Sequence, residues 1–496
     1  MGTSAFNPAI LREYDIRGIV GSMLDTGIAR QLGQAFGTMI AAKGGRSAVL
    51  GQDGRLSSPM LANAFARGLR AAGIDVFRIG TGPSPMLYFA EGHLQADAAA
   101  MVTGSHNPPD YNGFKLVLGG QSLYGDDLQQ LGRLIADRTF ASGSGRSIRR
   151  SVLGTYARRL LQDADLMRPL NVVWDPGNGA AAPVVALLAK ALPGRHVVLN
   201  GEVDGNFPGH HPDPTLPETL EQLRAAVLEQ RCDLGIAFDG DGDRIGVIDN
   251  RGRILWGDQL MMLWAEDILA HRPGATIIAD VKTSQTLFDR VAELGGRPLM
   301  WRTGHSLIKK KMRETGAALA GEMSGHIFFA DRYYGFDDAP YAAIRLLNII
   351  TQDSPPDGRS LADLHDRLPK AVNTPELRIP VEQPVRGADK FGIIERVKAH
   401  LRDAGAQLSD IDGVRVLTDD GWWLLRASNT QEILVGRCEA KTPEALERLK
   451  GVLAGELRRA GLAAADIAAV AGLQPAAAAT APASTLAPDS RRRRVA

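Results

Sequence analysis

Three aspartates alternate with glycines in one short acidic turn. The segment FDGDGDR places Asp239, Asp241 and Asp243 two positions apart. Carboxylates held this close repel one another, so they stay ionised only beside a compensating cation. Their hard oxygens select Mg²⁺ or Ca²⁺. An EF-hand is excluded, because its sixth and twelfth loop positions require Gly and Glu and are here Arg244 and Asn250. The turn therefore predicts a site for a Mg²⁺ ion that also binds a phosphate, with Arg244 beside it.

A serine and a histidine stand side by side in TGSHNPPDYNGFK, where two prolines and an Asn-Gly pair favour a rigid turn. The Gly-x-Ser-x-Gly pattern of a hydrolase nucleophile is absent around Ser105. A phosphate on this serine would carry about −1.5 to −2 charges and supply an oxygen ligand to the metal ion. We therefore predict a transferable phosphoserine at Ser105, with His106 and Lys115 nearby as proton or charge partners. A purely structural turn is the alternative.

The segment GEMSGH follows a helix-like stretch and precedes the strand-like IFFA. Its Glu322 and Ser324 alternate, so both can point to one side and hold vicinal sugar hydroxyls. His326 is a candidate proton donor or a structural residue. Upstream, TGHSLIKKKM places His305 at the start of a basic helix, and we expect its lysines on a solvated face.

The segment RASNTQE lies between two apolar strand-like runs near the end of the folded region. It offers a guanidinium, two hydroxyls and an amide from Arg426, Ser428, Asn429 and Thr430. These groups predict a concave phosphate-binding loop, with a plain polar hairpin as the alternative.

Length and composition agree with a water-soluble protein of several domains. At 496 residues the chain exceeds one core, and about 150 residues per domain predicts three or four. No apolar run is long enough to span a membrane, and the first residues lack signal-peptide features. The two cysteines are far apart and match neither a disulfide framework nor metal-ligand spacing. These features predict a reducing, cytoplasmic location and no membrane partner.

Charge argues against nucleic acid as a partner. The chain carries a formal net charge of +1, and residues 471–496 hold four arginines and one aspartate, so the remainder carries −2. We therefore expect no broad polyanion-binding surface. The Ala/Pro-rich segment 471–496 is predicted to be a disordered, solvated tail.

Helix-period segments alternate with short apolar runs, which predicts an α/β fold with largely parallel sheets. A strand–loop–helix unit begins near residues 47, 170 and 275, which indicates a topology repeated without a sequence period. From about Glu376 the pattern becomes α+β and ends in a helix with leucines at helical spacing.

The four loops, in this order, resemble the α-D-phosphohexomutase family, and the resemblance runs from about Tyr14 to Glu439. TGSHNPPDYNGFK is similar to its phosphoserine loop, DGDGDR to its metal loop, GEMSGH to its sugar-recognition loop and RASNT to its phosphate-binding loop. REYDIRG is similar to its opening segment and brings Tyr14 and Arg17. The amino-acid sequence is most similar to that of the bacterial bifunctional branch of the family.

The resemblance implies a monomer with four domains around a central cleft, three of them with similar mixed α/β sheets and a smaller, mobile C-terminal α+β domain. The expected boundaries are 1–150 for the phosphoserine-bearing domain, 151–254 for the metal-binding domain, 255–370 for the sugar-recognition domain and 371–470 for the phosphate-binding domain.

The reaction implied by the resemblance moves phosphate reversibly between O1 and O6 of glucose and mannose phosphates. Phospho-Ser105 gives its phosphate to the sugar, the 1,6-bisphosphate turns around in the cleft, and its other phosphate returns to Ser105. Mg²⁺ would be held by the three aspartates and Ser105, and glucose 1,6-bisphosphate would act as activator. Such sugar phosphates feed nucleotide-sugar and surface-polysaccharide synthesis.

By resemblance, further residues contact the substrate or share acid–base work, and none is singled out as the general base. The catalytic set is Ser105, His106, Lys115, Arg17, Arg244 and His326. The substrate-binding set is Tyr14, Arg17, Lys282, His305, Glu322, Ser324, His326, Arg426, Ser428, Asn429 and Thr430.

Four other functions are alternatives to this one. A phosphoglucomutase of the branch specific for glucose normally has a different sugar loop. A phosphoglucosamine mutase usually has Gln where this chain has Met323. A non-catalytic sugar-phosphate sensor would be favoured by loss of Ser105 or of an aspartate, and all are present. A phosphatase acting through phosphoserine needs water in the cleft, which a closing fourth domain would exclude.

Overall fold

The computed structural model describes residues 6–352, 359–381, 385, 387–429 and 431–468. Two compact units are present: the larger contains the chain up to Ala371 with 409–415 and 428–431, and the smaller contains the other described residues. The predicted tail at 471–496 and the predicted ligand Thr430 lie outside the described residues.

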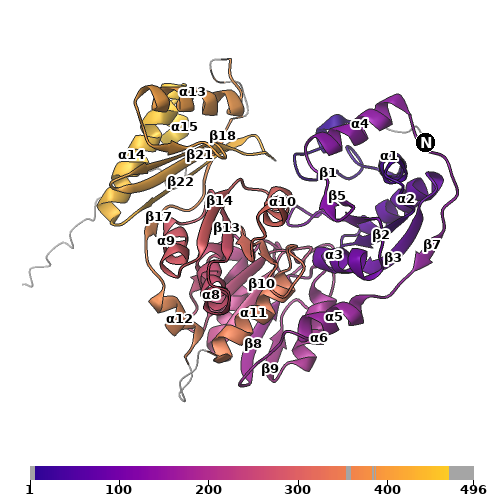
Figure 1. The fold of residues 1–496 in the computed structure, drawn as a ribbon, viewed down its shortest axis with the longest axis horizontal. Helices are drawn as coiled ribbons and strands as arrows, with labels where there is room; N and C mark the ends of the chain where they lie inside the picture. Colours follow the sequence, from indigo (N-terminus) through magenta and orange to yellow (C-terminus); the bar gives the residue numbers. More distant parts are fainter. Residues whose placement is uncertain (1–5, 353–358, 382–384, 386, 430, 469–496) are drawn as a thin grey trace, which may run out of the picture. The chain divides into compact units, whose positions relative to one another are not determined.

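The larger unit repeats one sheet pattern three times (Figure 1). In each sheet three parallel strands are followed by a fourth that runs antiparallel to the third, in the orders β3-β2-β4-β5, β9-β8-β10-β11 and β14-β13-β15-β16. The predicted α/β class and repeated topology are confirmed. The sheets are mixed, as the resemblance implies, rather than largely parallel, because the last strand of each pattern returns through a short loop and runs antiparallel.

The first sheet has the order β1-β5-β4-β2-β3-β7, with β6 paired to β5. Its strands are β1 (Ile16–Ile19), β2 (Ser47–Gln52), β3 (Asp75–Thr81), β4 (Ala98–Val102), β5 (Tyr111–Leu118), β6 (Gln121–Ser122) and β7 (Ser147–Arg149). Its helices are η1 (Pro8–Ile10), α1 (Thr26–Ala42), α2 (Ser58–Ala71), α3 (Ser84–His93) and α4 (Asp126–Asp137). Strand β4 is buried along its whole length, as a continuous apolar strand in a covered sheet should be.

The second sheet has the order β12-β11-β10-β8-β9. Its strands are β8 (Leu170–Asp175), β9 (Gly194–Val198), β10 (Leu234–Phe238), β11 (Ile245–Asp249) and β12 (Ile254–Leu255). Its helices are α5 (Leu153–Leu161), α6 (Ala182–Ala191), η2 (Pro217–Leu220) and α7 (Glu221–Glu229). Trp174 at the end of β8 stacks on Phe238 at the end of β10, with ring centroids 6.3 Å apart, so the residue preceding the acidic turn is anchored in the core.

The third sheet has the order β14-β13-β15-β16. Its strands are β13 (Thr276–Asp280), β14 (Arg297–Trp301), β15 (Leu319–Gly321) and β16 (Ile327–Phe329). Its helices are α8 (Gly257–His271), α9 (Gln285–Glu293), α10 (His305–Thr315), α11 (Ala339–Gln352) and α12 (Leu361–Arg367). One continuous apolar core includes residues from all three sheets, among them Val49, Trp174 and Ile277.

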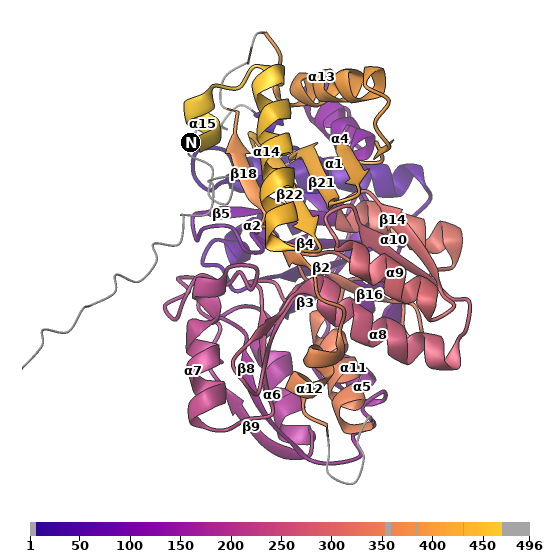
Figure 2. The same ribbon diagram turned by 90° about the vertical axis from the view of Figure 1, so that its left-hand side faces the viewer.

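The smaller unit is an α+β structure built on the sheet β17-β22-β21-β20-β19, with β18 also paired to β22. Its strands are β17 (Val372–Asn373), β18 (Leu377–Pro380), β19 (Leu408–Ser409), β20 (Val414–Thr418), β21 (Gly421–Ala427) and β22 (Ile433–Ala440), and its helices are α13 (Lys390–Asp403), α14 (Pro443–Ala460) and α15 (Ala464–Ala468). Figures 1 and 2 both show α14 lying along β22. The predicted leucines of α14 are buried at Leu449, Leu453 and Leu457.

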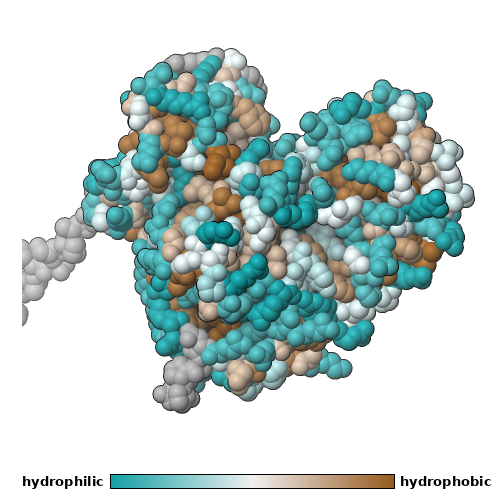
Figure 3. Space-filling view, viewed as in Figure 1, coloured by the Kyte–Doolittle hydropathy of each residue, from teal (hydrophilic) through white to brown (hydrophobic). Residues whose placement is uncertain are grey.

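Hydrophilic residues predominate on the face drawn in Figure 3, with hydrophobic residues in small groups between them. Within the described part of the chain, no helix combines the length and the apolar character needed to cross a membrane.

Candidate active site

Three predicted functional loops occupy the same position in the repeated sheet pattern. Ser105 lies in the turn between β4 and β5, the three aspartates lie between β10 and β11, and Glu322 to His326 lie between β15 and β16. Each loop therefore follows the carboxyl end of a parallel strand, the edge at which open α/β sheets bind ligands. An isolated backbone bridge pairs Arg244 with His326, so the second and third loops are in direct contact. GEMSGH was expected to follow a helix, but β15 precedes it.

The first loop holds Ser105 in a left-handed backbone conformation, with φ of 46°. Its Oγ donates a hydrogen bond to Asp239 Oδ2 at 2.8 Å, across a sequence separation of 134 residues. Its backbone N–H is bound by Thr103 Oγ1, and its carbonyl oxygen accepts a hydrogen bond from the buried Arg55 guanidinium at 2.7 Å. An αL serine is uncommon and persists only where its surroundings fix it. The loop thus holds Ser105, the residue predicted to carry a phosphate, against the acidic turn.

The acidic turn brings its three carboxylates together in the protein interior. Asp239, Asp241 and Asp243 are fully buried, and one oxygen from each lies within 4.8 Å of the others. Lys115 reaches in from β5, with Nζ 2.7 Å from Asp241 Oδ2 and 2.5 Å from Asp243 Oδ2. Lys115 is therefore the nearest counter-ion of the cluster. The sequence predicted Lys115 as a partner of Ser105 and did not reveal this pairing.

The pKa values of the aspartates diverge because their environments differ. Burial, followed by repulsion from Asp243 and Asp241, raises the pKa of Asp239 well above its usual value. Burial also opposes ionisation of Asp243, but Lys115 and His326 outweigh it and hold that pKa well below the usual value. Asp239 is thus the carboxylate that the protein's own charges compensate least, and it would gain most from a bound cation.

The donor set fits a hard divalent metal ion. Asp241 Oδ1 is buried and accepts no hydrogen bond from the described residues, whereas the buried Asp243 Oδ1 lies 3.3 Å from His326 Nε2. Buried carboxylate oxygens without a donor are costly unless a cation binds them. Asp239, Asp241 and Asp243 would hold the ion, and a phosphate on Ser105 would provide a further oxygen ligand.

The third loop forms a charged pair beside this cluster. Glu322 Oε2 lies 2.7 Å from His326 Nδ1, and Glu322 Oε1 accepts the Gly304 N–H at 2.6 Å. Ser324 Oγ lies 3.0 Å from the same His326 nitrogen. Burial opposes the cationic form of His326, but Asp243 and Glu322 outweigh it and raise the pKa to about 9. Glu322 and Ser324 therefore share one side of the loop, as predicted from their alternation.

His305 begins α10 and stacks on His326, with ring centroids 5.7 Å apart. Burial and the nearby Lys309 and Lys115 hold the pKa of His305 well below its usual value, so it is neutral where His326 is cationic. Lys309 is buried and pairs with Asp337 at 2.9 Å. This corrects the prediction that the lysines of this helix share a solvated face; only its two neighbours Lys310 and Lys311 are more accessible.

Two further cations and a histidine surround the serine loop. Arg17 donates a hydrogen bond to the Thr103 carbonyl oxygen at 3.1 Å. Arg244 Nε lies 3.3 Å from His326 Nε2. His106 Nδ1 lies 2.9 Å from Asp213, but burial and Arg244 lower the pKa of His106 to about 4, so its ring is neutral at pH 7.

The other residues that the sequence predicts to bind substrate are spread over several loops and strands. Lys282 Nζ lies 4.0 Å from Asp280. Tyr14 donates a hydrogen bond to the Thr303 carbonyl oxygen at 2.8 Å and accepts one from Asn429 at 2.6 Å. Ser428 Oγ accepts the Gln431 N–H at 3.2 Å. Arg426 is the buried penultimate residue of β21, in the smaller unit.

Sequence reasoning missed the residues that support these loops. Asp53 accepts the Gly104 N–H at 2.9 Å, and Arg55 binds backbone carbonyls of the serine loop. Ser84, at the start of α3, donates a hydrogen bond to Asp241 at 2.6 Å. A signal was present in the polar segment DGRLS, which directly follows the apolar strand β2 and resembles a loop at a carboxyl strand end.

Four family models match successive parts of the chain. They describe phosphoglucomutase/phosphomannomutase α/β/α domain I at residues 8–142, domain II at 154–252, domain III at 256–372 and the C-terminal domain at 376–455. The chain belongs to the phosphoglucomutase/phosphomannomutase family. It is a member with all four domains of that family, as the sequence predicted.

Relatives in this family are similar over nearly their whole length. The phosphomannomutase/phosphoglucomutase of Pseudomonas aeruginosa is 45% identical over 450 residues, covering 91% of this chain and 96% of the relative. The phosphoglucomutase of Neisseria gonorrhoeae is 43% identical over 444 residues, covering 89% of this chain and 95% of the relative. A crystal structure of a phosphoglucomutase/phosphomannomutase family protein from Burkholderia thailandensis superimposes with a TM-score of 0.85 at 45% identity, covering 92% and 98% of the two chains.

Proposed function

We propose that this protein interconverts the 1-phosphates and 6-phosphates of glucose and mannose, with Ser105 carrying the phosphate between the two positions. The observation that supports this most strongly is the hydrogen bond of 2.8 Å between Ser105 Oγ and Asp239, within a cluster of three buried aspartates. A serine there is placed to carry a phosphate whose oxygens reach the same metal ion as the aspartates. Relatives 45% identical over most of the chain bear the names of both activities.

The first transfer leaves a hexose 1,6-bisphosphate. The free sugar hydroxyl attacks the phosphorus of phospho-Ser105, the new P–O bond to the sugar forms, and the bond between phosphorus and Ser105 Oγ breaks. The hydroxyl proton leaves to a nearby base while Ser105 Oγ becomes an alkoxide that takes up a proton. After the bisphosphate turns around, the other phosphate returns to Ser105 by the reverse exchange. Phosphate is conserved throughout, so no co-reactant is consumed.

Mg²⁺ is the proposed metal ion, bound by Asp239, Asp241, Asp243 and the phosphate on Ser105. When bound, it neutralises negative charge on the phosphoryl group. Lys115 supplies a second positive charge to the same carboxylates. The ion and Lys115 together let three buried carboxylates stay ionised.

Protein charges around Ser105 would orient the sugar phosphate and share proton transfer. Arg17, His106, Arg244 and His326 are the proposed groups. Of these, His326 is a candidate proton donor because its pKa is raised to about 9, whereas the pKa of His106 is lowered to about 4. A donor and an acceptor with separated pKa values are what acid–base transfer at one site needs.

Glu322 and Ser324 are proposed to bind two neighbouring sugar hydroxyls in both orientations of the bisphosphate. Their oxygens converge on one nitrogen of His326, so they form one compact polar surface. Glucose and mannose differ only at C2, which this pair does not need to contact. The groups proposed to bind the rest of the substrate are Tyr14, Lys282, His305, Arg426, Ser428, Asn429 and Thr430.

The test is turnover of glucose 1-phosphate, mannose 1-phosphate and glucosamine 1-phosphate with Mg²⁺ and a trace of glucose 1,6-bisphosphate as activator. We expect rapid conversion of the first two, slow conversion of the third, and a phosphate on Ser105 by intact-mass and peptide analysis. Ser105→Ala should abolish turnover, and Ser142→Ala, in an exposed loop, is the matched control.

Each other outcome identifies a different function. Preference for glucosamine 1-phosphate would assign the protein to phosphoglucosamine mutation. Continuous release of inorganic phosphate would assign a phosphatase. Tight binding of sugar phosphate with no turnover would indicate a binding protein. Elution as a single chain in size-exclusion chromatography would support the proposed monomer.

A further inference from the structure

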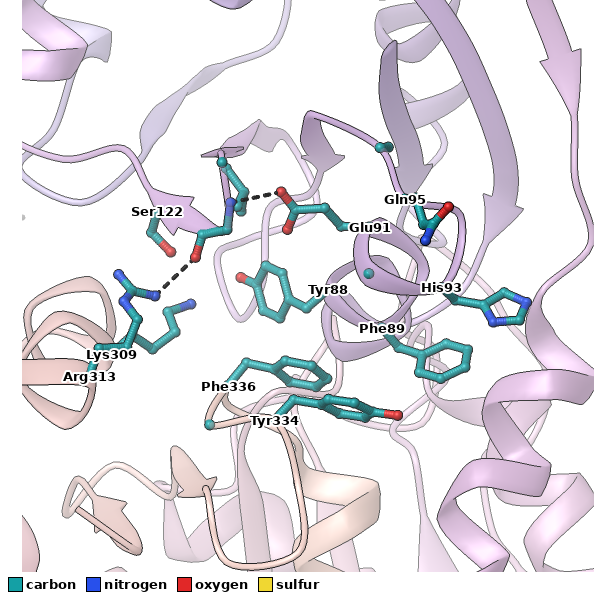
Figure 4. A pocket seen from close by; sticks show the side chains of 16 residues that line it. Tyr88, Phe89, Glu91, His93, Gln95, Ser122, Lys309, Arg313, Tyr334 and Phe336 are labelled. Atoms are coloured by element: carbon teal, nitrogen blue, oxygen red, sulfur yellow. Dashed lines mark hydrogen bonds between the residues drawn. The ribbon is translucent and has the colours of Figure 1, made fainter. Parts of the chain in front are cut away.

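A cavity of about 560 Å³ opens in the larger unit between α3, the turn from β5 to β6, α10 and the loop before α11 (Figure 4). None of its lining residues belongs to the set proposed for phosphoryl transfer. The volume lies within the range of small-molecule sites, which are lined mostly by apolar and aromatic side chains with a few placed polar groups. The side chains that line the cavity therefore indicate which ligand it would bind.

Aromatic rings form one wall of this cavity. Tyr334 and Phe336 are stacked with an interplanar angle of 10° and centroids 5.7 Å apart, and Tyr88 lies 5.5 Å from Phe336. Tyr334 is 56% exposed although it is a large aromatic side chain, and Phe336 is only partly buried. An aromatic ligand that covered these rings would gain both burial and offset or edge-to-face contacts.

At one end of the cavity, a carboxylate and a guanidinium both bind the backbone of Gly120. Its N–H donates to Glu91 Oε1 at 3.2 Å, and its carbonyl oxygen accepts from Arg313 Nη1 at 2.9 Å, as the dashed lines in Figure 4 show. A carboxylate from α3 and a guanidinium from α10 thus flank the same backbone unit. The two groups together present one negative and one positive charge to a ligand.

The Glu91 carboxylate can accept more hydrogen bonds than the described residues donate to it. Glu91 is only 8% exposed, and its second oxygen accepts no hydrogen bond from the described residues. Burial raises its pKa, and the Gly120 N–H, Lys309 and Arg313 offset this only in part. A bound ammonium group would offset the burial cost of this carboxylate.

Arg313 is the cation available to an anionic ligand group. It is exposed and forms no ion pair within 4 Å with a carboxylate of the described chain. Lys309 lines the same cavity, but its ammonium is already paired with Asp337 and lies 4.3 Å from the centroid of the Tyr88 ring. A guanidinium binds a carboxylate through two parallel hydrogen bonds, which favours Arg313 as the anchor.

We propose that this cavity binds a small aromatic zwitterion of the α-amino acid class. The ligand ammonium pairs with Glu91, its carboxylate pairs with Arg313, and its ring lies against Tyr334 and Phe336. An aromatic amino acid carries its two charges on one carbon, which matches a carboxylate and a guanidinium anchored to one glycine. A sugar phosphate has no aromatic ring and no cation, so it is a poor match for the same groups. This inference does not depend on the proposed mutase activity.

The test is isothermal titration of the full chain with L-phenylalanine and L-tryptophan. Three analogues each remove one feature: 3-phenylpropionate lacks the ammonium, phenethylamine lacks the carboxylate, and L-leucine lacks the ring. We expect saturable binding of both aromatic amino acids and at least ten-fold weaker binding of each analogue.

Paired variants assign the contacts. Glu91→Gln keeps an acceptor for the Gly120 N–H and should weaken phenylalanine binding at least ten-fold while leaving 3-phenylpropionate unaffected or improved. Arg313→Gln should weaken phenylalanine but not phenethylamine. Arg297→Gln, an exposed arginine on β14, is the matched control and should change neither. Circular dichroism and the mutase rate of each variant show whether the fold is intact.

The proposal is overturned if neither aromatic amino acid binds saturably to the intact protein. It is also overturned if Glu91→Gln and Arg313→Gln both bind phenylalanine as the unmodified protein does. Binding of a nucleoside diphosphate probe, with no binding of amino acids, would assign the cavity to a different ligand class. Failure of mutase turnover would leave these binding results unchanged.

Discussion

Lys115 is predicted to act as a built-in counter-ion whose loss makes the protein depend on the metal ion. Its ammonium lies between Asp241 and Asp243 and is 5% exposed. Replacing it by Met keeps the aliphatic stem but leaves three buried carboxylates without their nearest cation. Removing one partner of a buried ion pair costs about 3–5 kcal/mol. We therefore expect Lys115→Met to lose about that much unfolding free energy in EDTA.

Magnesium should restore most of this loss. Mg²⁺ and Lys115 neutralise the same carboxylates, so the ion meets less electrostatic competition in the variant and binds it more tightly. A ligand at a hundred times its Kd stabilises the folded state by about 2.7 kcal/mol, and a tighter Kd increases this gain at the same concentration. The gain in stability from Mg²⁺ should thus be larger in Lys115→Met than in the unmodified protein.

The assay is urea unfolding followed by tryptophan fluorescence. One of the six tryptophans, Trp174, stacks on Phe238 immediately before the acidic turn. Each protein is measured in EDTA and in saturating Mg²⁺. Arg345→Met is the matched control, because Arg345 is a buried cation that contacts two aspartates, Asp267 and Asp331, in the same unit. It should be destabilised without selective recovery in Mg²⁺.

Two results would refute the reasoning on Lys115. A loss below about 1 kcal/mol in EDTA would show that the carboxylates need no such counter-ion, since buried pairs cost more than this to break. An equal loss in EDTA and in Mg²⁺ would show that the metal ion does not bind the carboxylates that Lys115 contacts.

Three further predictions concern stability and turnover. Burial raises the pKa of the Asp338 carboxyl to about 7 despite several hydrogen bonds to it. The stability that this carboxyl contributes is therefore complete below its pKa in the unfolded chain and is lost as pH rises through 7. The unfolding free energy of the protein, compared with that of Asp338→Asn, should fall by about 3 kcal/mol between pH 5 and pH 8. A Cβ on Gly240 would lie 2.4 Å from the Ser105 carbonyl oxygen, so Gly240→Ala should displace that serine and lower kcat about a hundred-fold in the mutase assay. Glu322→Gln removes the charged partner of His326 and should raise KM for glucose 1-phosphate about ten-fold.

Each of these predictions has a control and an opposing result. A constant stability difference across pH would exclude Asp338 as the titrating group. Gly92→Ala has no atom within 4 Å of the added Cβ and should keep full activity; equal loss in both alanine variants would show that the close approach is irrelevant. Glu314→Gln, exposed on α10, should leave KM unchanged, and an unchanged KM in Glu322→Gln would remove it from substrate binding.

Local pattern predicted the elements that depend on local physics. Apolar runs such as Leu234 to Phe238 predicted strands because burial on both faces requires such runs. The acidic turn and the proline-rich serine loop were found because glycine, proline and clustered carboxylates restrict the backbone and the chemistry of a short segment. The GEMSGH loop was found too, but the short strand β15 before it was read as helix, since three residues carry too little periodicity to distinguish the two.

By itself, the sequence determined the fold class, the repeated topology and the positions of the candidate loops along the chain, because hydrophobic periodicity and turn chemistry act over a few residues. Only the tertiary structure decided which side chains meet: that Ser105 reaches Asp239 over 134 residues, that Lys115 neutralises Asp241 and Asp243, and that Lys309 is buried. The same holds for Glu91 and Arg313, which meet at Gly120 from different helices. Such pairings arise when loops, strands and helices that are far apart in the sequence pack against one another, and no local pattern contains that packing.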